Sequence, residues 1–307
     1  MKQLPDKVLF EEAATYLQIP ASYVEKDWFV TQVIDLVSRA NISGFEIVFT
    51  GGTALSKAHG LLERFSEDVD FRVQVPDELR NRKSLSHFRK AIITALREGG
   101  FAFTDEQVRA RDENRFFSIL LPYESHFTKA VALRPHIQIE LTARDTQLPH
   151  IHLPVASFVS SISKQPPEVA RIACIDPAES AADKLSALAW RIPDRVRGEK
   201  YDDPSIVRHI HDLALLKDIA LAHNKFSALA GASMAEDSSR PKNVPELADM
   251  PAQDRFDLTL KILSEDATYA MEYDEFVSTL SYAPTGKTPS YASAVEAVRV
   301  LAKTVIA

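Results

Sequence analysis

Two aspartates separated by one residue have the spacing that metal-assisted phosphate chemistry requires. Asp68-Val69-Asp70-Phe71 alternates polar and apolar residues as a half-buried β-strand does. Both carboxylates should therefore project from one face of the strand, with their Cα atoms roughly 6.5 to 7 Å apart. Two carboxylates held side by side require a cation, and Mg²⁺ suits them because it binds carboxylate and substrate phosphate oxygens together. A pair of such ions can hold the reacting phosphate during an in-line phosphoryl displacement.

A candidate anion-binding turn comes shortly before the two aspartates. The apolar residues 45–49 predict a short buried strand, Gly51 and Gly52 predict a tight turn, and residues 53–60 predict a helix. Backbone N–H groups at a helix start lack partners within the helix, and with the helix dipole they favour a phosphate. Either motif alone has a simpler explanation, because a Gly-Gly pair is usually only a turn and Asp-x-Asp is usually a solvated strand face. Together, in this order, the motifs are more specific.

The order of these motifs resembles the nucleotidyltransferase superfamily typified by DNA polymerase β. GGTALSK at residues 51–57 followed by RFSEDVDF at residues 64–71 is similar to one branch, the AbiEii/AbiGii family of nucleotidyltransferase toxins of the type IV toxin–antitoxin kind. Three other segments resemble this family, namely VEKDWFVT at 24–31, DKLSAL at 183–188 and RHIHDL at 208–213. The resemblance extends from about residue 20 to about residue 220, and nothing specific is recognised beyond it.

The resemblance implies functional roles for five residues, Thr53, Asp68, Asp70, Lys184 and Asp212. Asp68 and Asp70 would bind Mg²⁺, and Lys184 would hold the triphosphate of a nucleoside triphosphate. Thr53 stands where many members of the superfamily carry Ser, which keeps the hydroxyl group. Two roles stay open for Asp212, a contact to the nucleotide or a bond that fixes Lys184.

The other parts of such a reaction can be assigned to nearby residues. Nucleotidyl transfer needs a metal to neutralise charge on the α-phosphate and pyrophosphate, a cradle for the β- and γ-phosphates, and cations that hold the leaving group. The Gly-Gly turn and the Thr53 hydroxyl would form the cradle. Lys57 and Arg191 are further candidates, after Lys184, for holding the triphosphate. None of the nine histidines is assigned an acid or base role, because a metal-dependent transferase does not need one.

A third carboxylate is expected from a later strand. Residues 136–142 alternate as a strand, so Glu140 faces the same side as Gln138. In the superfamily that this chain resembles, a later strand brings a third carboxylate beside the Asp-x-Asp strand. Glu140 is the first candidate and Asp145 the second, although a lone strand glutamate is usually only exposed.

The predicted elements indicate two domains. Helical spacing at residues 6–17 and 22–38 predicts two helices that brace the sheet. The other predicted elements are a helix at 84–98, strands at 116–121 and 136–142, helices at 177–191 and 204–216, a loop at 233–251 and two or three helices ending with 291–306. The resemblance implies an α+β fold, with a polymerase β-type nucleotidyltransferase core of mixed sheet and flanking helices at 1–165 and a helical C-terminal domain at 166–307.

Composition restricts the partners. The chain has 307 residues, 45% hydrophobic and 26% charged, which is typical of a globular protein. No apolar run reaches the roughly 18 to 20 residues that span a bilayer, and the N-terminus lacks an apolar signal core, so we expect a cytoplasmic protein without a membrane partner. The net charge of −7 disfavours a broad nucleic-acid-coating surface, and no DNA partner is expected. Basic clusters at residues 80–97 and 191–200 still allow local binding of a nucleic acid.

The resemblance also implies a biological role. We expect a toxin of a toxin–antitoxin or phage-defence system, paired with a cognate antitoxin protein. Its predicted reaction is the Mg²⁺-dependent transfer of a nucleotide from CTP, UTP or GTP to RNA, in particular the 3′ acceptor end of tRNA. A single-stranded RNA end needs few phosphate contacts, so an acidic protein can bind it. The alternatives are transfer to a small molecule or a protein hydroxyl, and a catalytically idle nucleotide-binding interaction module.

Ser66 is a candidate regulatory residue. It lies two residues before Asp68, so a phosphate on its hydroxyl would place up to two negative charges beside the metal-binding carboxylates and repel a triphosphate. In some systems of the family that this chain resembles, the antitoxin is a kinase that marks a serine at this motif. The alternative is a turn serine without a regulatory role.

Overall fold

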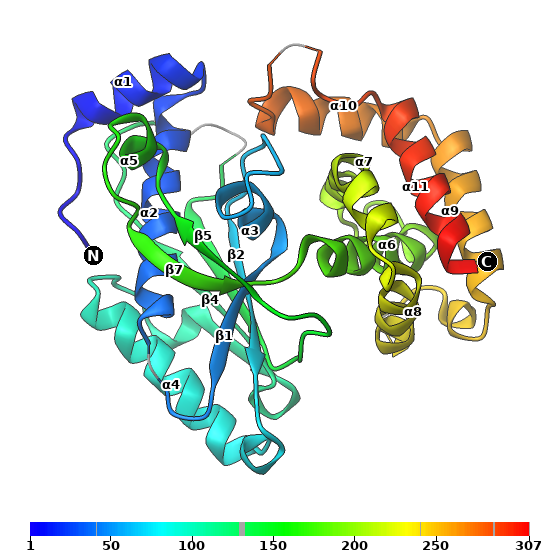
Figure 1. Cartoon of the computed structure of the whole chain (residues 1–307), viewed down its shortest axis with the longest axis horizontal. Coiled ribbons are helices and arrows are strands. Elements are labelled where there is room, and N and C mark those ends of the chain that lie inside the picture. Colours follow the sequence, from blue (N-terminus) through cyan, green and yellow to red (C-terminus); the bar gives the residue numbers. More distant parts are fainter. Residues whose placement is uncertain (41, 129–132, 240, 285, 307) are drawn as a thin grey trace. The chain divides into compact units, whose positions relative to one another are not determined.

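The computed structural model describes all residues except 41, 129–132, 240, 285 and 307, and the chain divides into two compact units (Figure 1). The first unit comprises Met1–Gly60 and Phe65–Ile175, and the second comprises Leu61–Arg64 and Asp176–Ala307. The boundary thus follows Ile175 instead of the predicted residue 165. The reason is a strand at Val169–Cys174 (β7), missed from the sequence, which pairs with the first strand of the sheet.

A mixed β-sheet forms the centre of the first unit, and over the described residues it has seven strands in the order β3-β4-β5-β2-β1-β7-β6. The strands before β7 are β1 (Glu46–Thr50), β2 (Asp68–Gln74), β3 (Val108–Arg111), β4 (Phe116–Pro122), β5 (His136–Thr142) and β6 (Ile151–Val155). The central strand, β2, is antiparallel to β1 and parallel to β5. The Asp-x-Asp motif therefore lies in the middle of the sheet.

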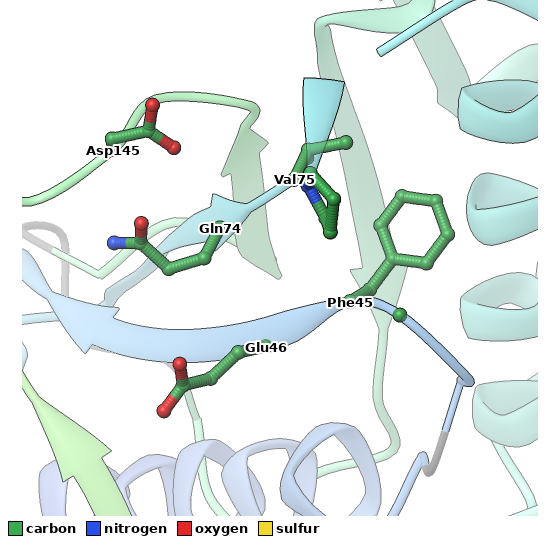
Figure 2. A pocket seen from close by; sticks show the side chains of 7 residues that line it. Phe45, Glu46, Gln74, Val75 and Asp145 are labelled. Carbon is green, nitrogen blue, oxygen red and sulfur yellow. The ribbon is translucent and has the colours of Figure 1, made fainter. Parts of the chain in front are cut away.

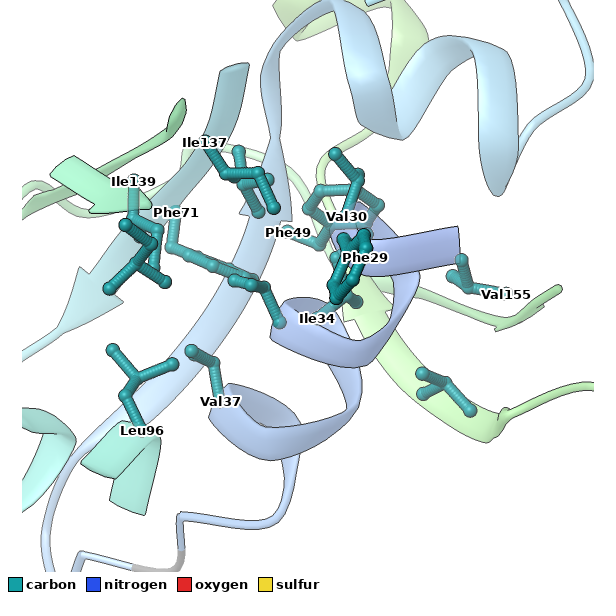
Figure 3. Close-up of a cluster of buried hydrophobic side chains, with 14 of the residues drawn as sticks. Phe29, Val30, Ile34, Val37, Phe49, Phe71, Leu96, Ile137, Ile139 and Val155 are labelled. Atoms are coloured by element: carbon teal, nitrogen blue, oxygen red, sulfur yellow. The ribbon is translucent and has the colours of Figure 1, made fainter. Parts of the chain in front are cut away.

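Helices cover one face of this sheet. The helices of the first unit are α1 (Lys7–Leu17), α2 (Ala21–Ser38), α3 (Gly51–Lys57), α4 (Arg82–Glu98) and α5 (Phe158–Ile162), with 3₁₀ turns at Asp77–Leu79, Asp105–Gln107 and Asp112–Asn114. In Figure 3, Ile34 and Val37 of α2 lie over Phe71 of β2, and Leu96 of α4 points towards the same cluster. Each fully buried side chain of this kind stabilises the fold by about 2 kcal/mol. The two predicted bracing helices are confirmed as α1 and α2.

Alternation along the strands leaves the polar side chains on the opposite face. Val69 and Phe71 of β2 are buried in the core with Ile139 of β5. Because neighbouring residues in a strand point to opposite sides, Asp68 and Asp70 lie on the face away from this core. The fold thus provides a polar surface at the sheet centre.

The Gly-Gly motif opens a helix instead of preceding one. α3 begins at Gly51 and ends at Lys57, so the helix starts two residues earlier than predicted and ends three residues sooner. Gly51 has φ +76°, a conformation that side chains with a Cβ rarely adopt. The chain therefore turns from β1 into α3 at a position that requires glycine.

The second unit is helical. Its helices are α6 (Pro177–Asp194), α7 (Val207–Ala222), α8 (Phe226–Glu236), α9 (Ala252–Glu265), α10 (Thr268–Leu280) and α11 (Tyr291–Ile306), with 3₁₀ turns at Pro204–Ile206, Asp237–Ser239 and Pro245–Ala248. α6 packs against α7, α8 and α9. It starts as predicted at Pro177, where the Asp176 side chain accepts a hydrogen bond from the N–H of Ala178 at 2.8 Å.

The loop predicted at 233–251 is partly helical. α8 continues to Glu236, and two 3₁₀ turns follow. The indole N–H of Trp190 on α6 donates to the Met234 carbonyl at 3.0 Å, and Met234 itself is buried. This packing against α6 overrides the turn-forming composition of the segment. In the described part of the chain, no helix has the length and apolar composition that a membrane span requires.

Candidate active site

Asp68 and Asp70 lie on one face of β2, each beside a residue of β5 on the same face. In the parallel register, Asp68 is next to Gln138 and Asp70 is next to Glu140. On the other side of β2, Asp70 pairs with Thr50, the residue just before α3. All three acidic side chains are half-buried, so they can be reached from solvent.

The start of α3 lies directly against Asp70. A Cβ atom built on Gly51 would lie 2.2 Å from Asp70 Oδ2, which is closer than two such atoms can approach. The absence of a side chain at Gly51 therefore allows the helix start and the Asp70 carboxylate to be neighbours. The predicted phosphate cradle and the predicted metal-binding carboxylates thus occur together.

Thr53 fixes the start of α3 to the start of β2. Its side chain is fully buried, and its hydroxyl donates to the backbone carbonyl of Asp68. The hydroxyl has a single proton, so in this arrangement it cannot also donate to a phosphate. Thr53 positions Asp68, and the cradle is left to backbone N–H groups at the helix start.

The structure brings Glu140, and not Asp145, to Asp70. Glu140 accepts a hydrogen bond from Gln138 Nε2 at 2.6 Å and is next to Asp70 in register. Asp145 instead lies in the loop after β5, where it accepts two hydrogen bonds from Arg80 Nη2 at 2.9 and 2.7 Å. Figure 2 shows Asp145 at a pocket with Gln74, at the end of β2 remote from Asp68.

Arg134 contacts Asp68 and is itself linked to Glu67 and Lys26, and the sequence analysis assigned none of these three residues to the site. Arg134 Nη1 donates to Asp68 Oδ1 at 2.6 Å. Glu67 pairs with both Arg134 and Lys26. Burial lowers the pKa of Lys26, against the opposing effect of Glu67. The one available signal for Lys26 was its place in the segment VEKDWFVT, since a charged residue among buried positions of a helix requires a partner.

Lys57 lies in a buried ion pair. Its ammonium group pairs with Asp27 of α2, and the two side chains are 6% and 4% exposed. Asp27 also accepts a hydrogen bond from the N–H of Phe158 at 2.7 Å. Burial raises the pKa of Asp27, while Lys57 and the Phe158 N–H oppose this shift. Lys57 thus ties α3 to α2 and α5, and the structure does not place its ammonium group at the Asp68–Asp70 face.

Within the second unit, Lys184 belongs to a buried charge cluster around Asp212. Lys184 Nζ lies 2.9 Å from Asp212 Oδ2. Arg64 Nε and Nη2 each donate to the Asp212 carboxylate at 2.7 Å. Burial alone would raise the pKa of Asp212, but Arg64 and Lys184 hold it well below its usual range. Burial lowers the pKa of Lys184, and Arg64 adds to this shift while Asp212 opposes it. Of the two roles open for Asp212, this geometry provides the bond to Lys184.

Four other basic residues of the second unit are either held neutral or paired with carboxylates. Burial, with Lys184 and Arg208, holds the pKa of His209 well below its usual range. Arg191 forms an ion pair with Asp203. Two other arginines of the 191–200 cluster are neutralised in the same way, because Arg195 and Arg197 pair with acidic residues, which are Asp202, Asp266 and Glu272.

The donors at Asp68 and Asp70 fit a Mg²⁺ ion that takes its remaining ligands from water or substrate. Among the residues that the structure describes, no three or more His, Cys, Asp or Glu side chains are grouped to hold a metal ion by themselves. Mg²⁺ typically takes one or two carboxylates from a protein and keeps water and substrate phosphate oxygens as its other ligands. Two carboxylates beside a helix start meet that requirement, whereas a closed metal cage would need more.

Comparisons with known proteins point to one family. A family model described as "Nucleotidyl transferase AbiEii toxin, Type IV TA system" matches residues 36–297. Among solved structures, MenT4, a nucleotidyltransferase toxin from Mycobacterium tuberculosis H37Rv, is similar with a TM-score of 0.52 and 17% sequence identity. That similarity covers 95% of this chain and 98% of the MenT4 chain, and it bears on the fold. Among curated protein sequences, none matches.

Proposed function

Because this chain belongs to the AbiEii family of nucleotidyl transferase toxins of type IV toxin–antitoxin systems, we propose that it transfers a nucleotide from CTP, UTP or GTP to the 3′ acceptor end of tRNA in the cytoplasm, with Mg²⁺. The observation that carries this proposal is the close contact between the Asp70 carboxylate and Gly51, the first residue of α3. This contact supports the proposal, because carboxylates suited to a metal lie beside a helix start whose backbone N–H groups are suited to phosphates.

Each residue of the proposed site has a distinct task. Asp68 and Asp70 hold Mg²⁺, which when bound supplies positive charge to the α-phosphate and the pyrophosphate. The N–H groups at the start of α3 hold phosphate oxygens. Glu140, beside Asp70, orients the attacking hydroxyl or accepts its proton. Lys184, which Asp212 orients, holds the triphosphate.

Labelled nucleotides test the acceptor and the donor together. Purified protein is incubated with Mg²⁺, total tRNA and each of the four labelled nucleoside triphosphates in turn. We expect label on tRNA with CTP, UTP or GTP. Label on a protein or small molecule in a cell extract, with none on tRNA, would leave the transfer chemistry but replace the acceptor.

Replacement of the metal-binding carboxylates tests the chemistry itself. Asp68→Asn and Asp70→Asn should each lower the transfer rate by at least about a hundredfold, since each removes a charge from the metal site. Asp77→Asn is the matched control, because the Asp77 side chain is fully exposed at the far end of β2. Full transfer activity in either site variant would refute the metal assignment.

We also propose that a cognate antitoxin protein controls this site, and that Ser66 is the point of control. Ser66 is half-buried and precedes Glu67 and Asp68. A phosphate on its hydroxyl would stand beside both carboxylates and disfavour triphosphate binding. Coexpression with the protein encoded next to the toxin gene should add one phosphate to Ser66, measured by mass spectrometry. An unmodified Ser66 in an inactivated toxin would exclude this control.

A further inference from the structure

Arg134, two residues before β5, holds the Asp68 carboxylate with a guanidinium group that also reaches solvent. Besides the 2.6 Å hydrogen bond to Asp68, Arg134 Nη1 donates to Gln138 Oε1 at 3.2 Å, and Nε lies 3.3 Å from Glu67 Oε1. The Arg134 side chain is 38% exposed, so a ligand can approach it from solvent. A cation thus stands at the candidate metal site within the first unit itself.

The main chain of Arg134 is fixed by charged groups on both sides. Its N–H donates to Glu67 Oε2 at 3.1 Å, and its carbonyl accepts a hydrogen bond from Lys26 Nζ at 2.9 Å. The Lys26 side chain is fully buried, and it also pairs with Glu67. The main chain of Arg134 is therefore anchored, while its partly exposed side chain can rotate to bring the guanidinium group from one partner to another.

Asp68 Oδ1 cannot serve the guanidinium group and a metal ion equally. The charge-assisted hydrogen bond from Arg134 occupies that oxygen, and the positive charge of the guanidinium group opposes the approach of a divalent cation. If a cation binds Asp68, Arg134 loses this hydrogen-bond partner. Its guanidinium group would then stand beside a polyphosphate bound at the same place. Arginine suits that new partner, because its planar fork matches phosphate oxygens in pairs.

On the basis of the proposed function, we propose that Arg134 changes partners in each catalytic cycle. It holds Asp68 until a divalent cation binds this carboxylate, and it then binds the triphosphate. Arg134 is thus a substrate-binding residue in addition to those assigned above. The exchange implies effects of opposite sign on cation binding and on phosphate binding.

Two equilibrium measurements test the exchange without any turnover. Binding of Mn²⁺ alone, and binding of inorganic tripolyphosphate in excess Mn²⁺, are measured by calorimetry for the whole chain. Arg134→Gln should tighten Mn²⁺ binding by about tenfold and weaken tripolyphosphate binding by about tenfold, the size of one charge-assisted hydrogen bond. Arg109→Gln is the matched control, because Arg109 is an exposed arginine on β3 of the same unit, and it should leave both constants unchanged.

A lysine variant separates charge from shape. Arg134→Lys keeps the positive charge, so Mn²⁺ binding should stay within about twofold of the wild type, while tripolyphosphate binding should remain several-fold weaker because the planar fork is lost. The proposal is overturned if both constants move in the same direction in Arg134→Gln, if neither moves, or if Arg134→Lys binds tripolyphosphate like the wild type. Circular dichroism and urea unfolding establish that each variant is folded.

The same measurements distinguish a failure of the Arg134 proposal from a failure of the proposed function. Asp68→Asn should abolish Mn²⁺ binding whatever Arg134 does. Normal Mn²⁺ binding in Asp68→Asn would remove the metal site and with it the proposed function. Loss of Mn²⁺ binding in Asp68→Asn, combined with an inert Arg134→Gln, would overturn the role of Arg134 alone.

Discussion

Gly51 of α3 and Asp70 of β2 approach each other so closely that no side chain fits between them. A Cβ atom on Gly51 would lie 2.2 Å from Asp70 Oδ2 and 3.0 Å from Asp70 Cγ. Gly51 also has φ +76°, so the turn and the contact both require glycine. The motif Gly-Gly-Thr and the motif Asp-x-Asp are therefore two sides of one contact.

A methyl group at Gly51 should abolish activity by moving the Asp70 carboxylate. Gly51→Ala combines backbone strain of about 1–2 kcal/mol with the clash against Asp70. Gly198→Ala is the matched control, because Gly198 has φ +78° and nothing within 4 Å of the added atom. We expect urea unfolding to show a loss of about 1–2 kcal/mol in Gly198→Ala and at least that loss in Gly51→Ala, and the transfer assay to show loss of activity in Gly51→Ala alone. Equal activities would mean that the Gly51–Asp70 contact has no catalytic importance.

Lys57 should prove structural. Lys57→Met leaves Asp27 buried without its cation, which typically costs about 3–5 kcal/mol, whereas Lys57→Met with Asp27→Asn removes both charges and should recover most of that stability. Urea unfolding measures both. The double variant should keep the wild-type KM for the nucleoside triphosphate, as should the control Lys90→Met, an exposed lysine on α4. A raised KM in the double variant alone would return Lys57 to the triphosphate site.

The sequence predicted the local part of the site better than its distant partners. Gly51, Asp68 and Asp70 are recognisable because turn chemistry and strand alternation act over a few residues. Arg134 and Lys26 come to Asp68 only through the pairing of β5 with β2 and the packing of α2, so no spacing near the motif indicates them.

The same limit explains the errors in the fold. β7 pairs with β1, which lies more than a hundred residues earlier in the chain, so its six residues gave no local sign of belonging to the sheet. By contrast, β5 was predicted with its observed bounds, because alternation at His136–Thr142 is a local signal. Arg64 binds Asp212, which lies 148 residues later in the chain. Arg64 stands next to the Asp-x-Asp motif in the sequence, so nothing local indicated that it belongs to the second unit.

Acid should remove the stability that Asp212 contributes. The pKa of Asp212 is held well below its usual range by Arg64 and Lys184, so its contribution is present above the unfolded-state pKa of about 3.9 and is lost as the pH falls below that value. Asp212→Asn leaves two buried cations without a counter-charge and should lower the free energy of unfolding at pH 7 by about 3–5 kcal/mol.

The pH dependence distinguishes this loss from a general packing defect. The difference between the wild type and Asp212→Asn should shrink in urea unfolding as the pH falls from 4 towards 2. Asp218→Asn, an exposed aspartate on the same helix, should differ from the wild type by less than about 0.5 kcal/mol at every pH. A difference for Asp212→Asn that stays constant with pH would contradict the ion-pair explanation.

His209 should make the protein less stable in mild acid, although no catalytic role is assigned to it. Its ring nitrogen Nδ1 is buried and, among the described residues, has no hydrogen-bond partner. Burial, Lys184 and Arg208 hold the pKa of His209 well below 6.5. As the pH falls below 6.5, the unfolded chain therefore binds a proton at His209 that the folded chain does not bind. Stability is therefore present above the unfolded pKa of about 6.5 and should fall by about 1 kcal/mol towards pH 5.5.

His209→Gln should remove this slope in urea unfolding between pH 7.5 and 5.5, whereas His87→Gln, on the exposed side of α4, should keep it. An unchanged slope in His209→Gln would show that the ring is protonated as readily in the folded chain as in the unfolded one.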